Sequence, residues 1–143
     1  MVPAKLIQKM GWKRIVALSV FIAGGACRAV HQDWVTYQVA DGLVGNHVYA
    51  VTFEQDEVVW FGTREGASRF DGENWMNYTS EEGLVYDHVY DIFIDSRKII
   101  WFATGDGVSR FDGTNWTTFT YLDGLPNNRV FSIAETSDGD MWF

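Results

Sequence analysis

The sequence has almost no cysteine, because Cys27 is the only one among 143 residues. A single thiol cannot form an intramolecular disulfide, so no disulfide framework holds this chain together. Helical periodicity is also missing: after Ala29 no stretch repeats its apolar residues every 3.6 positions for long enough to make a helix. The chain contains no phosphate-binding glycine loop, no nucleophile elbow and no metal-binding helix motif. These absences point to an all-β protein without a recognisable catalytic motif.

Basic residues are few, since 11 Lys and Arg stand against 19 Asp and Glu, for a net charge of −8. Residues 1–26 hold four of the basic residues and no acidic residue, so residues 27–143 have a net charge of −12. Such an acidic surface repels phosphate backbones and anionic membranes, so nucleic acid is excluded as a partner. Hydrophobic residues at 47% and aromatic residues at 16% exclude a disordered tail.

No apolar run is long enough to cross a bilayer. The longest near the N-terminus, residues 15–23, has nine residues, whereas a helix needs roughly 20 to span about 30 Å. Basic residues up to Arg14 precede this run and small residues at 24–26 follow it, which is typical of a cleaved signal peptide over residues 1–26. Met10 is an alternative start, and an uncleaved N-terminal anchor is an alternative interpretation.

Cys27 follows those small residues directly, as in the cleavage site of bacterial lipoproteins. In that pattern the residue three positions before the cysteine is usually aliphatic, and here it is Gly24. Cys27 is thus a lipidation candidate, and the alternative is ordinary cleavage that leaves a free thiol. Both interpretations predict an exported chain, periplasmic or at the cell surface, and lipidation of Cys27 would attach it to the membrane through the N-terminus only.

A repeat of 41 residues runs through the rest of the chain. It is marked by Trp60, Trp101 and Trp142, and no insertion or deletion interrupts it from Trp34 to Phe143. Units of constant length must meet their neighbours in one fixed geometry.

Each unit reads as four strands joined by turns. In one unit these strands are residues 88–95, 99–104, 108–112 and 116–120. Gly and Asn occupy the turns, and β-branched and aromatic residues fill the strands. Four short antiparallel strands per repeat are typical of a propeller blade, whose two faces are both covered. That coverage explains the continuous apolar run at residues 99–104.

The predicted fold is therefore all-β, a partial β-propeller with about two and a half blades. After a short linker at residues 27–33, the propeller covers residues 34–143: a lone outer strand at 34–39, blades at 47–79 and 88–120, and the start of a truncated blade at 129–143. We expect the outer strand to have no partner in this chain. The final "DGDMWF" is in register with the second strand of each blade, which predicts a fragment of a longer propeller.

Two motifs carry a resemblance to a known family. "WFGT" at residues 60–63 returns as "WFAT" at 101–104, departing only at Ala103, and "GASRFD" at 66–71 returns as "GVSRFD" at 107–112. These landmarks resemble the two-component regulator propeller repeat. The resemblance implies the extracytoplasmic part of a hybrid histidine kinase or related regulator, where the propeller binds a ligand, often a glycan fragment.

His47, His88 and Arg129 occupy one repeat position, just before the first strand of each unit. First strands line the channel of a propeller, so these side chains are candidates to bind an anionic or sugar ligand at one rim. The alternative is a tolerant loop position whose residue was inherited with the repeat. Two histidines are too few to hold a metal, and His31 lies outside the repeats, so we predict no metal, cofactor or catalytic set.

Three further patterns favour structural roles. Arg69 and Arg110 are expected to pair with Asp71 and Asp112 on the same strand face. The Asp-Gly pairs, including the calcium-loop-like residues 137–140, are better explained as hairpin turns than as calcium sites. The in-phase tryptophans are predicted to pack in the core, with a sugar-stacking platform as the alternative; they are Trp60, Trp75, Trp101, Trp116 and Trp142.

The main hypothesis for function is an extracytoplasmic ligand-sensing propeller module of a bacterial two-component-type regulator, here without its kinase output. Its expected partners are a small molecule or glycan, the missing blades and downstream signalling domains. The alternatives are a fragment of a metal-dependent propeller lyase resembling the streptogramin lyases, a cell-surface repeat protein for protein contacts, and a gene fragment with no activity of its own.

Overall fold

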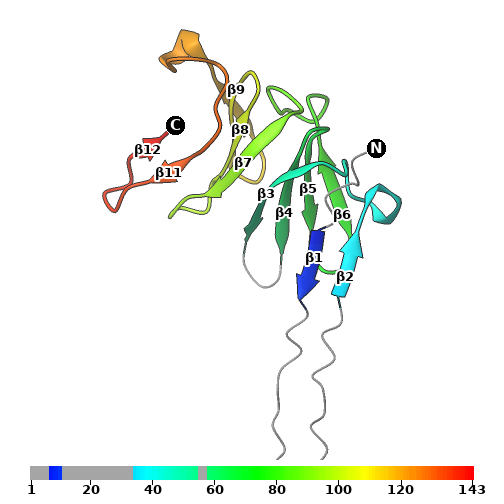
Figure 1. Cartoon of the computed structure of the whole chain (residues 1–143). Helices are drawn as coiled ribbons and strands as arrows, with labels where there is room; N and C mark the ends of the chain where they lie inside the picture. Colours follow the sequence, from blue (N-terminus) through cyan, green and yellow to red (C-terminus); the bar gives the residue numbers. More distant parts are fainter. Residues whose placement is uncertain (1–6, 11–33, 55–57) are drawn as a thin grey trace, which may run out of the picture.

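The computed structural model describes residues 7–10, 34–54 and 58–143 and confirms the predicted all-β, propeller-like architecture (Figure 1). Two four-stranded antiparallel sheets, ordered β3-β4-β5-β6 and β7-β8-β9-β10, form two blades. Two-stranded sheets, β1-β2 and β11-β12, flank them. In this part of the chain the helices are two 3-10 turns, and none is long and apolar enough to cross a membrane.

The strand bounds follow the repeat. The first blade has β3 (Val48–Phe53), β4 (Val59–Thr63), β5 (Ala67–Phe70) and β6 (Trp75–Tyr78), and the second has β7 (Val89–Ile94), β8 (Ile100–Thr104), β9 (Gly107–Phe111) and β10 (Trp116–Phe119). The flanking elements are β1 (Ile7–Met10), β2 (Trp34–Tyr37), β11 (Ala134–Glu135), β12 (Met141–Trp142), η1 (Val39–Asp41) and η2 (Tyr121–Asp123). Each blade is thus one up-and-down meander whose strands pair in sequence order.

The outer strand expected to be alone has a partner. It is β2, and it pairs antiparallel with β1 along four residues, from Ile7 opposite Tyr37 to Met10 opposite Trp34. A strand edge left bare exposes a row of unpaired backbone groups, and a nearby extended segment satisfies them. The remaining residues of the predicted signal peptide, together with Cys27, His31 and the linker, lie outside the described residues, and the signal peptide stays a prediction.

The core between the two blades is aromatic and aliphatic. Trp60 is 1% exposed, stacks on Tyr78 at 5.2 Å between ring centroids and meets Phe102 edge-on at 5.5 Å. Val89 and Ile92 of β7 complete this cluster with Ala50 of β3. Trp101, the next tryptophan in phase, is also buried. The core interpretation is therefore confirmed for Trp60 and Trp101. Trp75 and Trp116 are half-buried and pack against the core clusters, whereas Trp142 is 65% exposed.

The Gly-Leu loops pack closely on the fourth strand of their blade. Gly83 has φ +123°, and a Cβ added there would lie 2.5 Å from Cδ1 of Trp116. Buried serine hydroxyls hold the same loops, because Ser68 Oγ accepts from the N–H of Val44 at 2.9 Å and Ser109 Oγ accepts from that of Val85 at 2.8 Å. The serine of the "GxSRFD" motif thus joins each loop to its third strand.

The arginines of that motif do not pair with the aspartates that follow them. Arg69 Nε lies 3.1 Å from Oε2 of Glu54, and the guanidinium of Arg110 lies over the Trp101 ring, 5.8 Å from its centroid. Asp71 and Asp112 instead accept backbone N–H groups of their own turns, at 2.7–3.0 Å. Those bonds hold the pKa of both carboxyls below the usual value. The same-strand pairing prediction is wrong, because the turn amides are closer partners for a carboxylate than a side chain two residues back.

The start of the third repeat is fastened to the second blade by polar contacts. Asp91 Oδ2 accepts from the backbone N–H of Ile133 at 2.9 Å, and Thr104 O accepts from that of Val130 at 3.1 Å. Glu135 accepts from both the N–H and the hydroxyl of Ser96 at 2.8 and 2.7 Å. These bonds bring residues 129–135 alongside β7, so three first-strand segments lie next to one another (Figure 1).

Candidate functional site

The candidate site lies where β3, β7 and residues 129–133 run side by side. His47 and His88 stand immediately before β3 and β7, as the repeat requires. Their backbone carbonyls have the same role: His47 O accepts from the N–H of Arg64 at 3.1 Å, and His88 O accepts from that of Gly105 at 3.0 Å. The start of each first strand is therefore tied to the hairpin between the second and third strands of its own blade.

A β-bulge follows each histidine by two residues. Val48 lies opposite Thr63 and Ala50 opposite Gly62, so Tyr49 is an extra residue in β3. In β7 the same irregularity falls between Val89 and Asp91 and leaves Tyr90 extra. A bulge bends its strand and re-aims the side chain of the extra residue. The bulged tyrosines occupy equivalent positions of the two blades, and Tyr49 is exposed whereas Tyr90 is half-buried.

The bulged tyrosines belong to a continuous aromatic row. The ring centroid of His88 lies 4.8 Å from that of Tyr49 and 4.3 Å from that of Tyr90. The Phe131 ring, at the same repeat position in the third segment, lies 4.9 Å from Tyr90. Tyr49 and Phe131 are 51% and 62% exposed, so the row presents ring surface to solvent. We call these four side chains, Tyr49, His88, Tyr90 and Phe131, the aromatic row.

His88 is the most enclosed polar group in this row. Its Nε2 is buried and has no hydrogen-bond partner among the described residues. Burial lowers the pKa of His88, the Arg64 and Arg129 guanidinium groups lower it further, and Glu65 opposes them in part. The imidazole is consequently neutral at neutral pH, and it contributes an aromatic face rather than a positive charge.

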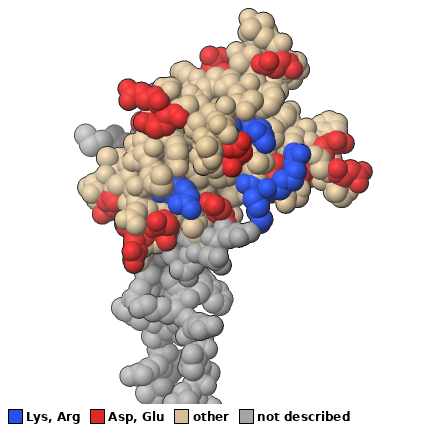
Figure 2. All heavy atoms as spheres, turned by 180° about the vertical axis from the view of Figure 1, so that it is seen from behind, with Lys and Arg blue, Asp and Glu red and all other residues tan. Residues whose placement is uncertain are grey.

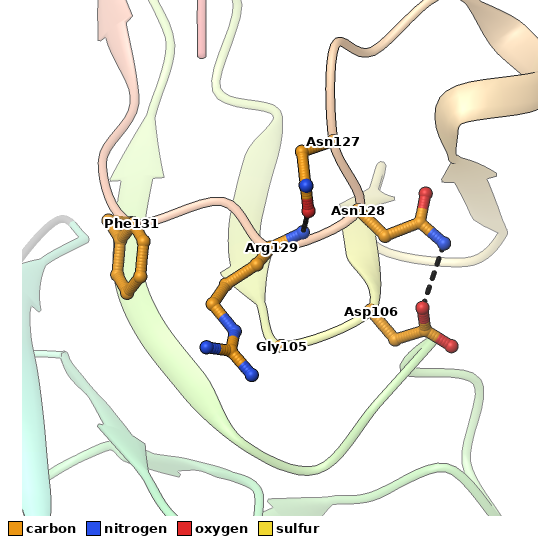
Figure 3. A pocket seen from close by; sticks show the side chains of 6 residues that line it. All are labelled: Gly105, Asp106, Asn127, Asn128, Arg129 and Phe131. Atoms are coloured by element: carbon orange, nitrogen blue, oxygen red, sulfur yellow. Dashed lines mark hydrogen bonds between the residues drawn. The ribbon is translucent and has the colours of Figure 1, made fainter.

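Arg129 borders an open hollow of about 630 Å³, lined also by Gly105, Asp106, Asn127, Asn128 and Phe131 (Figure 3). The loop before it is fixed by two side chains, since Asn127 Oδ1 accepts from the N–H of Arg129 at 2.8 Å and Asn128 Nδ2 donates to Asp106 Oδ1 at 2.8 Å. The side chains of Arg129 and Phe131 extend to the same side of their segment (Figure 3). Within the described ranges, no hydrogen bond or ion pair engages the guanidinium.

The three residues singled out by the repeat do not form an equivalent ring. His88 belongs to the aromatic row and contacts Tyr90, and the Arg129 guanidinium lies near enough to lower the pKa of His88. His47 is exposed, and its Nδ1 lies 3.9 Å from a carboxylate oxygen of Glu65. Across residues 7–10, 34–54 and 58–143 no three His, Cys, Asp or Glu side chains gather into a possible metal site.

The tyrosines and Phe131 were absent from the sequence-based set of site residues. The sequence does contain a pattern that marks them, because an aromatic residue follows His47, His88 and Arg129 by two positions in each repeat. Their exposure was the missing information, because a repeat pattern shows that three positions are equivalent but not how much of each side chain the neighbouring units cover.

Comparisons with known proteins agree with this architecture. The two component regulator propeller family matches residues 83–106 and 124–143. These stretches cover the first half of the second blade and the beginning of the third repeat. No protein of curated function matches the chain in sequence.

Three solved structures illustrate the fold similarity. The extracellular domain of a hybrid two component system from B. thetaiotaomicron is 23% identical over 76% of this chain and 16% of its own, with a TM-score of 0.68. Virginiamycin B lyase from Staphylococcus aureus is 21% identical over 68% of this chain and 34% of its own, with a TM-score of 0.56. The extracellular domain of a one component system from B. thetaiotaomicron is 19% identical over 66% of this chain and 13% of its own, with a TM-score of 0.50. The chain thus spans about a third or less of each structure.

Proposed function

We propose that this chain, which carries two-component regulator propeller repeats, is a ligand-binding part of an extracytoplasmic propeller in a bacterial two-component-type regulator. We propose further that residues 1–26 direct export of the chain. Its ligand is a small molecule or glycan, and its partners are further blades and signalling domains. Activity of the chain is binding and not catalysis.

The observation that carries the proposal is the aromatic row beside Arg129. Exposed ring faces bind the apolar faces of small ligands, and a few polar groups beside them fix orientation. The row combines two bulged tyrosines, one neutral imidazole and a phenylalanine from three successive repeats. Repeats that each contribute one ring to a shared surface are well suited to contact several units of an oligosaccharide.

The exposed rings and the two β-bulges also support a role in ligand recognition. Tyr49 and Phe131 expose about half or more of their surface, although burying an aromatic side chain is strongly favourable. A bulge at the same place in two blades costs backbone pairing twice. Ligand contact is a function that would compensate both costs.

Thermal unfolding of the full 143-residue chain tests this proposal. Neutral and acidic oligosaccharides, from dimers to hexamers, are added singly at millimolar concentration, and at least one should raise the midpoint by several degrees, because ligand that binds only the folded state stabilises it. Tyr90→Ala should remove that shift. Tyr121→Ala, which removes an exposed aromatic ring in η2 away from the row, should preserve it. An equal shift in both variants would show that binding does not use the row.

The same samples separate binding from catalysis. Each oligosaccharide that shifts the midpoint is incubated with the chain, with and without a divalent cation, and its mass is then measured. The proposal expects unchanged masses under both conditions. Cleavage that requires the cation would instead support the lyase-like alternative considered from the sequence.

A further inference from the structure

We propose that the aromatic row selects ligands whose ring carries a carboxylate, and that Arg64 and Arg129 are the specificity-determining residues. This inference rests on the proposed function, because it names the chemistry that the same site prefers. The shared chemistry is a ring with an apolar face and an attached carboxylate, which occurs both in uronic acids and in aromatic acids.

Two guanidinium groups lie near the row without an ion-pair partner in the described part of the chain. Arg64 is exposed and its backbone N–H donates to His47 O at 3.1 Å, at the start of β3, and the exposed Arg129 lines the hollow. Both guanidinium groups lower the pKa of His88. The three ion pairs of the described residues involve other bases, at His47, Arg69 and Arg97. A guanidinium presents two parallel N–H groups that match the two oxygens of a carboxylate, so an unpaired arginine at a binding surface favours that anion.

Two acids also lie near these arginines, and each has another partner. Glu65 carries one carboxylate, and it lies 3.9 Å from His47 Nδ1. Asp106 accepts a hydrogen bond from Asn128 in the wall of the hollow. His88 adds no charge, since burial and both arginines lower its pKa. Two arginines and the two carboxylates of Glu65 and Asp106 therefore lie around the row, and no ion pair joins them among the described residues.

That local balance contrasts with the rest of the protein. The chain has a net charge of −8. On the face shown in Figure 2 acidic side chains gather at several places along the margins, and basic ones are fewer. An acidic surface repels anions at long range, so a site that binds them needs nearby cations to offset that field. Exposed, unpaired arginines beside exposed rings meet this requirement.

The geometry places charge and ring faces within reach of one ligand. Arg129 and Phe131 are two residues apart in an extended segment, so their side chains lie on the same side (Figure 3). Phe131 in turn contacts Tyr90 at 4.9 Å. The hollow beside Arg129, about 630 Å³, is large enough for one or two sugar rings. A ring stacked on Tyr90 or Phe131 can therefore direct its carboxylate toward Arg129.

The test compares matched probes by isothermal titration calorimetry with the full chain. Trigalacturonate is paired with neutral galactotriose, and 4-hydroxybenzoate is paired with 4-hydroxybenzyl alcohol. We expect at least one acidic probe to bind about tenfold more tightly than its neutral partner, the usual size of one added charge-assisted contact. The pair that shows the difference identifies the source of the carboxylate, a uronate or an aromatic acid.

Arginine variants identify the residues responsible. Arg129→Gln and Arg64→Gln should each reduce the preference for the acidic probe severalfold and leave the neutral probe almost unaffected. Lys98→Gln is the control, because it removes the same charge from an exposed turn between β7 and β8. Circular dichroism of each variant verifies that the strands are retained.

Two different failures are distinguishable. If neutral and acidic probes bind equally and both arginine variants match the wild type, selection of carboxylates is overturned while binding at the row stands. If no probe binds and no oligosaccharide shifts the thermal midpoint, the proposed function fails together with the inference.

Discussion

Asp95 offers the sharpest test of how the second blade is held together. Its side chain is fully buried at the turn between β7 and β8. One carboxylate oxygen accepts from the N–H groups of Arg97 and Ile99 at 2.9 and 2.8 Å. The other accepts from the indole N–H of Trp101 at 3.0 Å. Replacing Asp95 therefore removes every acceptor of this network at once.

The expected cost follows from what each donor can do afterwards. The indole N–H belongs to a residue that is 6% exposed, so Asp95→Ala leaves it buried without an acceptor, at a cost of about 1–3 kcal/mol. The two turn amides lie beside the exposed Arg97 and can donate to water after the substitution, so the loss of each hydrogen bond costs about 1 kcal/mol. Asp95→Ala should then lower the free energy of unfolding by about 3–5 kcal/mol. Asp95→Asn should cost about half as much, since its amide oxygen still accepts from the turn.

The pKa of Asp95 adds a pH signature. Burial raises this pKa, but the hydrogen bonds from Trp101, Ile99 and Arg97 outweigh burial and hold it below its usual 3.8. A carboxyl with a depressed pKa in the folded state stabilises the fold above its unfolded value, and that stability is lost as the pH falls through the folded value. The difference between the wild type and Asp95→Asn should therefore be constant from about pH 7 to 5 and should shrink below about pH 4.

Urea unfolding of the full chain, followed by tryptophan fluorescence, measures these differences. Glu54→Gln is the matched control, because Glu54 is the equivalent residue of the first blade and accepts from Trp60 at 2.9 Å with a side chain that is one-third exposed. Its loss should be less than half that of Asp95→Ala. A change below about 0.5 kcal/mol for Asp95→Ala, or a difference from Asp95→Asn that persists unchanged to pH 3, would refute the reasoning.

Three further substitutions probe the packing of the repeats by the same unfolding measurement. Gly62→Ala should cost about 1–3 kcal/mol, because its Cβ would lie 2.9 Å from Val89 Cγ1 of the neighbouring blade, and a stability equal to wild type would show that the blades can separate slightly. Phe102→Ala empties a fully buried site and should cost about 3–5 kcal/mol, with a loss under 1 kcal/mol contradicting its place in the core. Ser109→Ala removes the buried hydroxyl that accepts from the N–H of Val85 and should cost about 1–2 kcal/mol, and no effect would mean that water replaces the hydroxyl.

The periodic features of this protein were predictable from the sequence. The 41-residue phase of Trp60 and Trp101 located both blades and placed these side chains in the core, where both are buried. Local signals sufficed for the four strands of each blade, because hairpin turns depend on neighbouring glycine and asparagine residues. The position of His88 immediately before a first strand followed from the same register, whereas in the third repeat the expected strand from Arg129 onward is limited to β11, Ala134–Glu135.

Contacts between distant parts of the chain were not predictable in this way. The sequence placed Arg69 beside Asp71, but the folded blade brings Glu54 closer to it and leaves Asp71 to its own turn. The partner of β2 also comes from a segment that the periodicity does not include. Such pairings depend on which surfaces meet after folding, and a repeat pattern carries information only about equivalent positions.

The sequence by itself thus determined the unit, its four strands and the phase in which units follow one another, because strand and turn propensities act over a few residues. Only the tertiary structure decided which side chains form a site. The bulges set the local pairing at Tyr49 and Tyr90, and the stacking of blades brings these rings together with His88 and Phe131. A bulge is a shift of pairing between two strands, so it exists only once both strands are in place.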